Sequence, residues 1–153
     1  MNLRSYLDDM GVNYAWLHHD PAYTAQTLAM AEHISGKKVI KPVVVKADGQ
    51  FVLCALPASY FVDIDQLRDE LHAREASLAN ERELEQLFAD CELGAEPPIG
   101  NLFGLPTIMD DSLAAQDQVT FQAGTHRDGV TMSVADYMRI AQPRVAHFGK
   151  SRA

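Results

Sequence analysis

The sequence contains only two cysteines, and they lie far apart. Cys54 and Cys91 fall outside any C-x-x-C pattern, so we expect reduced core thiols with neither a disulfide nor structural zinc. No apolar run approaches the roughly 18 residues of a membrane span, and no basic, apolar leader opens the chain. We therefore expect a soluble, cytoplasmic protein that makes no contact with a membrane.

The sequence also lacks the self-contained motifs of several large enzyme classes. It has no G-x-S-x-G, no H-E-x-x-H, no Walker loop and no glycine-rich dinucleotide fingerprint, which disfavours those classes. His18 and His19, followed by Asp20, form a weak metal candidate, because adjacent strand residues point to opposite faces. We assign these residues to turn and capping roles, and we expect no metal and no cofactor.

Positive charge is scarce. The 13 Lys and Arg against 21 Asp and Glu give a net charge of −8 at pH 7, which opposes non-specific binding to nucleic acid. Two basic clusters are local exceptions: Lys37, Lys38, Lys41 and Lys46, and the segment from Arg144 onward. From charge alone, we interpret the first as a solvated surface and the second as a frayed terminus.

With 153 residues, the chain is long enough for one globular core. Hydrophobic periodicity and capping residues predict helices near 3–10, 24–34, 64–71, 80–88 and 133–142. Alternating or β-branched runs predict strands near 12–18, 39–46, 51–56, 76–79, 107–109, 119–122 and 130–132. Pro42 cannot donate to a ladder, so it marks either the start of its strand or a sheet edge.

A stretch rich in glycine and proline, residues 91–106, interrupts this pattern. It contains three glycines and three prolines, and its backbone can present N–H groups to an oxyanion or a phosphate. A plain surface connection is the alternative. We favour a functional loop, because long structureless loops are uncommon in compact domains. Its expected apolar anchors are Leu93, Ile99, Leu102, Phe103 and Leu105.

Two polar residues are further candidates for a site. Lys41 interrupts an apolar strand, where a lysine either extends outward to solvent or lines a pocket, and the first is the more common outcome. His126 follows a predicted strand, where an imidazole either faces a cleft or serves as a satisfied structural group. Neither alternative is decided by the residues alone.

Three short blocks occur in order along most of the chain: Lys41-Pro-Val-Val-Val45, Gly94-Ala-Glu-Pro-Pro98 leading to Pro106-Thr-Ile-Met-Asp110, and Ala123-Gly-Thr-His126. Together they resemble the YbaK/prolyl-tRNA synthetase-associated editing-domain family. The resemblance implies one compact α/β (mixed α+β) domain, with a mixed, largely antiparallel sheet or partly open barrel surrounded by helices. It implies an editing domain over residues 1–143 and a basic C-terminal tail over 144–153.

The resemblance also implies site residues. Lys41 corresponds to the family's essential lysine, and Gly94 and Pro98 to its Gly-x-x-x-Pro loop; these three are the implied catalytic positions. The implied substrate-binding positions are Thr24, Ala95, Glu96, Pro97, Asp110, Gly124 and His126. The acidic position is either Asp110 or Asp111. Pro42 replaces a threonine that is common in the family.

The implied activity is that of a trans-editing aminoacyl-tRNA deacylase, which hydrolyses the ester bond of tRNA mischarged with a small amino acid. An activated ester needs a positioned water and oxyanion stabilisation more than a strong nucleophile, which suits a chain without a catalytic triad. The implied partners are the tRNA 3′ end and a synthetase or other translation factor, with no DNA. Two alternatives stay open: a non-catalytic module that binds a tRNA end or small ligand, and a hydrolase of another activated ester or amide.

Overall fold

The computed structural model describes residues 2–20, 25, 28–29 and 34–151. The helical elements are α1 (Leu3–Asp9), α3 (Ile64–Glu70), α4 (Glu81–Leu87), α5 (Val134–Ala141) and the 3₁₀ turns η1 (Gly100–Phe103) and η2 (Asp111–Ala115). The strands are β1 (Tyr14–His18), β2 (Ile40–Ala47), β3 (Gln50–Pro57), β4 (Tyr60–Val62), β5 (Ala76–Leu78), β6 (Thr107–Asp110), β7 (Gln118–Gln122), β8 (Asp128–Ser133), β9 (Arg144–Ala146) and β10 (Gly149–Ser151). The chain is a mixed α+β domain, as expected.

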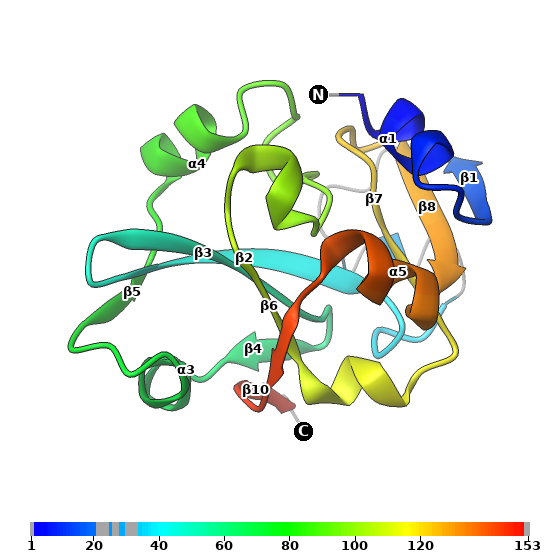
Figure 1. Ribbon diagram of the computed structural model, residues 1–153. Coiled ribbons are helices and arrows are strands. Elements are labelled where there is room, and N and C mark those ends of the chain that lie inside the picture. The colour runs from blue at the N-terminus through cyan, green and yellow to red at the C-terminus, as the bar shows by residue number, and fades with distance from the viewer. Residues whose placement is uncertain (1, 21–24, 26–27, 30–33, 152–153) are drawn as a thin grey trace.

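The strands that the structure describes form three sheets. A five-stranded sheet has the order β5-β2-β3-β6-β9, a three-stranded sheet the order β1-β8-β7, and β10 pairs with β4. Pairing is antiparallel except between β3 and β6 and between β6 and β9. In Figure 1 the β2–β3 hairpin runs across the middle of the molecule with its turn at the left; α4, β5 and α3 lie around the turn end, and β7, β8 and α5 lie toward the other end. The expected mixed, largely antiparallel arrangement is confirmed.

The β2–β3 hairpin is fixed by its turn. Asp48 and Gly49 both have positive φ, at 48° and 82°, which is the geometry that matches a tight two-residue turn to the twist of its strands. Pairing then runs continuously from Ala47 opposite Gln50 to Ile40 opposite Pro57. The two strands predicted near 39–46 and 51–56 are thus confirmed as a hairpin, and its register determines where Lys41 lies.

Pro42 lies on a free edge of β2. β5 pairs with β2 only from Val45 to Ala47, so the stretch of β2 that contains Pro42 has β3 on one side and no strand of the described chain on the other. A residue without an N–H is tolerated at such an edge. Of the two placements that the sequence allowed, the sheet edge is confirmed.

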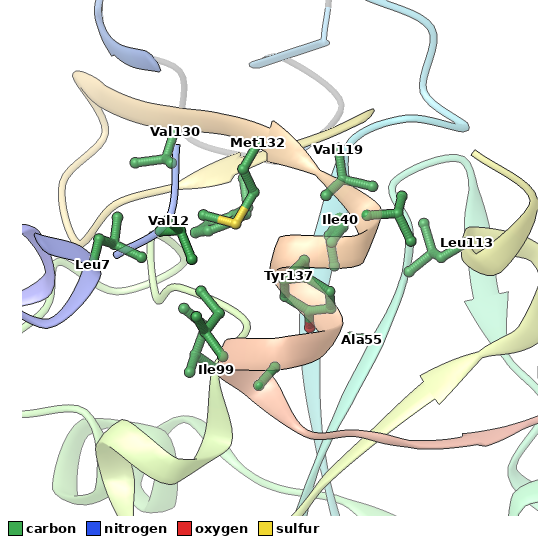
Figure 2. Close-up of a cluster of buried hydrophobic side chains, with 14 of the residues drawn as sticks. Leu7, Val12, Ile40, Ala55, Ile99, Leu113, Val119, Val130, Met132 and Tyr137 are labelled. Atoms are coloured by element: carbon green, nitrogen blue, oxygen red, sulfur yellow. The ribbon is translucent and has the colours of Figure 1, made fainter. Parts of the chain in front are cut away.

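The largest hydrophobic cluster surrounds α5. Figure 2 shows Tyr137 of α5 among side chains from α1, β2, β7, β8 and the glycine- and proline-rich stretch. Ile99 from that stretch is fully buried in this cluster. Burial of an apolar side chain of this size stabilises by about 1.5–3 kcal/mol. The segment around the candidate loop is therefore attached to the main core.

Side-chain caps mark the start of several helices. Asp63 caps α3 by accepting the N–H of Gln66, and Ser133 caps α5 by accepting the N–H of Asp136. Asn80 and Glu83 form a reciprocal capping box at α4. Each such cap is worth about 1 kcal/mol, so local sequence alone accounts for where these helices begin.

The segment from residue 144, which we expected to form a frayed basic tail, contributes two strands. β9 pairs with β6 and β10 pairs with β4. Between them, Phe148 is 1% exposed, and the N–H groups of Phe148 and Gly149 both donate to Asp110. Buried contacts hold this segment in place, so residues 144–151 are part of the folded domain.

Part of the expected helix at 24–34 lies outside the described residues. Leu28 and Ala29, which are described, are buried against Val39 and Ala58. No helix in the described ranges is both long and apolar enough to cross a bilayer.

Candidate active site

A pocket of about 530 Å³ opens between the free edge of β2, α4 and the glycine- and proline-rich stretch. Its wall is mostly apolar, and three charged residues lie in it. The lining residues are Ala25, Lys41, Pro42, Val43, Val44, Leu78, Ala79, Glu81, Leu84, Phe88, Leu93, Gly94 and Glu96. This volume falls within the range of small-molecule sites.

Lys41 lies in the wall of this pocket. It sits on β2 opposite Leu56 of β3, and the side chain is partly buried. Its Nζ donates a hydrogen bond to the backbone carbonyl of Tyr60 on β4. Of the two outcomes open from sequence, the structure therefore gives a pocket-lining lysine whose ammonium group is held by the protein.

The loop of residues 94–98 presents two of its five members to the pocket. Gly94 and Glu96 line it, whereas Ala95, Pro97 and Pro98 are buried in the protein. Gly94 has φ +90°, a conformation that glycine adopts at no steric cost. The structure thus brings Lys41, Gly94 and Glu96 together, and it places the other three behind the pocket wall.

Most backbone N–H groups of the 94–98 loop are already used or missing. The Gly94 N–H donates to Glu96 Oε1 over 3.1 Å, and the Ala95 N–H donates to the carbonyl of Glu92 over 3.0 Å. Pro97 and Pro98 have no N–H. Among the described residues, the Glu96 N–H has no acceptor, so it is the one amide that this loop can offer to a ligand.

The 123–126 turn supports the loop from behind. The Gly124 N–H donates to the carbonyl of Ala95 over 2.8 Å, and the Glu92 N–H donates to the carbonyl of Gly124 over 2.9 Å. The His126 N–H donates to Glu92 Oε1 over 2.8 Å. Neither Gly124 nor His126 is among the pocket-lining residues. Gly124 thus contacts the loop through the main chain, and His126 contacts the Glu92 side chain just before it.

Asp110 and Asp111 lie outside the pocket. Asp110 is fully buried, where it accepts hydrogen bonds from Ser112 and from the N–H groups of Phe148 and Gly149. Asp111 is exposed and pairs with His147 over 3.1 Å. This group brings potential metal ligands within 4.8 Å of one another, but the contacts of Asp110 are those of a carboxylate that anchors the C-terminal segment. The structure therefore places neither aspartate in the pocket wall, and a substrate-binding role at this position stays a prediction.

Thr24 lies outside the described residues, and its neighbour Ala25 lines the pocket. Leu93, expected to anchor the glycine- and proline-rich stretch, is instead 43% exposed at the pocket. Ile99 and Leu102 pack in the main core, and Phe103 and Leu105 pack beside Phe88. Four of the five expected anchors are therefore found, and the fifth contributes to the pocket.

Several pocket residues carried no functional pattern in the sequence. Leu84 and Phe88 were predicted as apolar positions of a helix, and Val44 as part of an apolar strand. All three line the pocket. Their spacing indicated burial correctly, but a core position and a pocket wall have the same periodicity. Only the fold, which leaves a pocket between α4 and β2, distinguishes a pocket-lining position from a core position.

Neither cysteine is activated as a nucleophile. Burial, with help from the nearby carboxylates of Glu96 and Asp90, raises the pKa of the Cys91 thiol to about 11. Burial raises the pKa of the Cys54 thiol to about 12. Both thiols are protonated at neutral pH, and the thiolate is the reactive form.

Comparison with known protein families and proteins identifies relatives of the chain. The model of the aminoacyl-tRNA editing domain matches residues 19–140. The multifunctional Ser/Thr-tRNA deacylase ProXp-y of Escherichia coli K12 is 29% identical over 154 residues, which cover 97% of this chain and 92% of that protein. The prolyl-tRNA editing protein ProX of Acetoanaerobium sticklandii is 24% identical over 142 residues, which cover 89% of this chain and 86% of that protein.

Solved structures share the fold. The crystal structure of the hypothetical protein APE2540 superposes with a TM-score of 0.88 at 17% identity, covering 97% of this chain and 99% of that one. A candidate trans-editing enzyme for prolyl tRNA synthetase superposes with a TM-score of 0.82 at 19% identity, covering 97% and 95%. Because the family model spans most of the sequence, the chain belongs to the aminoacyl-tRNA editing domain family.

Proposed function

We propose that the pocket between β2, α4 and the 94–98 loop hydrolyses the ester bond of tRNA mischarged with a small amino acid. As a member of the aminoacyl-tRNA editing family, the chain is an aminoacyl-tRNA deacylase. One observation supports this placement of the site above the others. Lys41, Gly94 and Glu96 come from segments far apart in the sequence and line one pocket.

The reaction suits a pocket without an activated nucleophile. An aminoacyl ester is already reactive, so its hydrolysis depends on a positioned water and on stabilisation of the oxyanion that forms at the carbonyl. The thiols of Cys54 and Cys91 are protonated at neutral pH. In this proposal, the terminal ribose hydroxyl of the substrate helps to activate the water, which leaves little for a protein base to do.

Lys41 and the 94–98 loop take separate roles. The ammonium group of Lys41 binds a phosphate or ribose oxygen of the tRNA 3′ end, since it is the cation in the pocket wall. The Glu96 N–H binds the ester carbonyl oxygen and the oxyanion, because the other loop amides are used internally or missing. The conformation of this loop requires a positive φ at residue 94, which glycine adopts without strain.

The substrate's side chain is small. Candidates are Ala, Ser, Thr and Cys, and the relatives are named for Ser/Thr-tRNA and prolyl-tRNA. An apolar pocket separates neighbours that differ by one methylene by only about 1–3 kcal/mol. The mostly apolar wall therefore predicts graded activity across small amino acids rather than a single accepted one.

Affinity for tRNA comes partly from another protein. A net charge of −8 opposes binding to a polyanion, so we assign part of the affinity to a synthetase or other translation factor. The reaction then takes place in the cytoplasm, where tRNA is charged and used.

Single-turnover deacylation tests the proposal directly. The wild type and Lys41→Ala are assayed on tRNA carrying Ala, Ser, Thr, Cys or Pro in turn. We expect the wild type to cleave one or a few of these and Lys41→Ala to lose about 100-fold or more in rate, as for loss of one group that stabilises a transition state. Circular dichroism of both proteins checks the fold.

Lys46→Ala is the matched control. Lys46 is on the same strand, outside the pocket, and forms a partly exposed ion pair with Glu83 over 3.1 Å. Such a pair contributes about 1 kcal/mol to stability, so this variant should stay folded and cleave at the wild-type rate. A folded and fully active Lys41→Ala would overturn the assignment of the lysine. Binding of tRNA without cleavage of any ester would favour the non-catalytic module.

A further inference from the structure

Glu96 is an unusual residue for the wall of an apolar pocket. Its exposed fraction is 6%, and it shares the wall with Val44, Leu84 and Phe88. One carboxylate oxygen, Oε1, accepts the Gly94 N–H over 3.1 Å. No other hydrogen bond or ion pair to the Glu96 side chain occurs within the described chain.

Because Glu96 is buried, its carboxylate has lost most of its contact with water, and a single hydrogen bond from the Gly94 N–H replaces that contact. Burial of a charge without a full set of partners is costly, and a matching cation offsets that cost when it binds. The pocket's other acidic residue, Glu81, is exposed in the first turn of α4, where water screens it. Of the two acidic residues in the pocket wall, Glu96 is therefore the one whose charge affects which ligand binds.

The proposed substrate has one cationic group near its ester. The tRNA end carries negative phosphates, whereas the amino acid carries an α-ammonium group one carbon from the carbonyl. The Glu96 residue supplies both a backbone N–H without an acceptor and a buried carboxylate. We propose that the Glu96 carboxylate binds the α-ammonium group of the aminoacyl ester, and that the site therefore selects aminoacyl-tRNA with a free amino group.

This inference rests on the proposed function and adds a substrate class to it. An N-acylated aminoacyl-tRNA, such as a peptidyl-tRNA, has a neutral amide where the ammonium would lie. Its entry would leave the Glu96 carboxylate desolvated and without a cation. The pocket therefore disfavours N-blocked esters by charge.

Glu96→Gln separates charge from structure. The glutamine side chain keeps an oxygen that can accept the Gly94 N–H, and it keeps the volume of the glutamate. Only the negative charge is lost. Glu75→Gln is the matched control, because this substitution removes the same charge from the whole protein. Glu75 is exposed and lies outside both pockets that Glu96 lines.

The assay compares the mischarged tRNA that the wild type cleaves fastest with the same tRNA after N-acetylation of its amino acid. We expect Glu96→Gln to lose about tenfold in rate on the free-amine ester, as for the change from a charged to a neutral hydrogen bond. The rate on the N-acetylated ester should stay unchanged. The ratio of the free-amine rate to the N-acetylated rate should therefore fall by about the same tenfold. Glu75→Gln should behave as the wild type on both.

Two other results would overturn the inference. An equal loss on the free and the acetylated ester would mean that Glu96 only shapes the loop. A loss on seryl- and threonyl-tRNA but none on alanyl-tRNA would mean that Glu96 binds a side-chain hydroxyl instead of the ammonium group.

A binding measurement keeps this inference separate from the proposed reaction. The probe is a 3′-aminoacylamino analogue of terminal adenosine, whose amide is not hydrolysed, with its amine free or acetylated. Calorimetry should show tighter binding of the free amine to the wild type and loss of that preference in Glu96→Gln. If no ester is cleaved but this pattern holds, the proposed function fails while Glu96 still selects the amine. Equal binding of both probes to the wild type would overturn the role of Glu96 even if esters are cleaved.

Discussion

The Tyr137 hydroxyl donates a 2.6 Å hydrogen bond to the carbonyl oxygen of Pro98. Tyr137 is fully buried on α5, and burial raises the pKa of its hydroxyl far above the ordinary value. The hydroxyl therefore keeps its proton throughout the physiological range and always acts as the donor. This bond attaches the end of the 94–98 loop to the central helix of the main core.

Tyr137→Phe should lower both stability and activity. The change leaves the buried Pro98 carbonyl without its donor, which costs about 1–3 kcal/mol, and it frees one end of the loop. Urea unfolding and single-turnover deacylation measure the two effects. Tyr14→Phe is the control, because the Tyr14 hydroxyl donates to the Asp8 carboxylate over 2.7 Å at the surface, away from the loop. An unchanged rate in Tyr137→Phe would show that this bond does not position the loop.

Gly94→Ala should impair the reaction beyond its effect on folding. Gly94 has φ +90°, and an alanine in a left-handed conformation costs about 1–2 kcal/mol. Gly104→Ala provides a matched comparison, since Gly104 has φ +71° and ends η1 outside the pocket. Both variants should lose stability by thermal unfolding, while only Gly94→Ala should lose deacylation rate. Equal rates in the two variants would contradict a role for the loop conformation.

The Asp128 carboxylate should stabilise the fold in a pH-dependent manner. Burial opposes its ionisation, but hydrogen bonds from Thr125, His18 and Trp16 outweigh that effect and lower its pKa below the ordinary 3.8. Because the folded-state pKa is lowered, the contribution is present above pH 3.8 and is lost as pH falls through the folded value. Asp128→Asn should cost about 1–3 kcal/mol at neutral pH.

The pH series decides whether charge is the cause. Chemical unfolding of wild type and Asp128→Asn from neutral pH to about pH 3 should show a difference that shrinks as the native carboxylate is protonated. A difference that stays constant across this range would attribute the loss to shape rather than to ionisation.

Gly149→Ala should destabilise the whole domain. A Cβ at this position would lie 2.9 Å from Cγ of the buried Asp110, so the side chain or the strand must shift, at a cost of about 1–3 kcal/mol. Lys150→Ala is the neighbouring control: Lys150 is exposed and pairs with Asp63 at the surface. If both variants unfold at the wild-type denaturant concentration, the C-terminal strands contribute little to the fold.

Local patterns were enough to predict most elements. The Asp48-Gly49 turn specified the central hairpin, and Asn80 with Glu83 specified the start of α4, because turn and cap chemistry depend on neighbours in sequence. β9 and β10 were missed for the opposite reason. Each is three residues long, and each is held by contacts with β6, β4 and Asp110, which are distant in the chain.

The site was predicted in part. The resemblance to the editing family is confirmed. Lys41 of the first block lies in one pocket with Gly94 and Glu96 of the second, whereas Gly124 and His126 of the third lie outside it. Asp110 could not be placed from sequence, because its position after a strand is compatible with either a cleft or a buried anchor. The roles of Lys41 and Glu96 in hydrolysis stay predictions for the experiments above.

The free edge of β2 has a consequence for self-association. An exposed strand edge is a template on which another chain can add a strand. At this edge Pro42 presents a ring in place of an N–H donor, and it does so in the wall of the pocket. A second copy of the chain thus finds no continuous row of donors there. The same proline that lines the pocket therefore disfavours the addition of a strand from another chain at this edge.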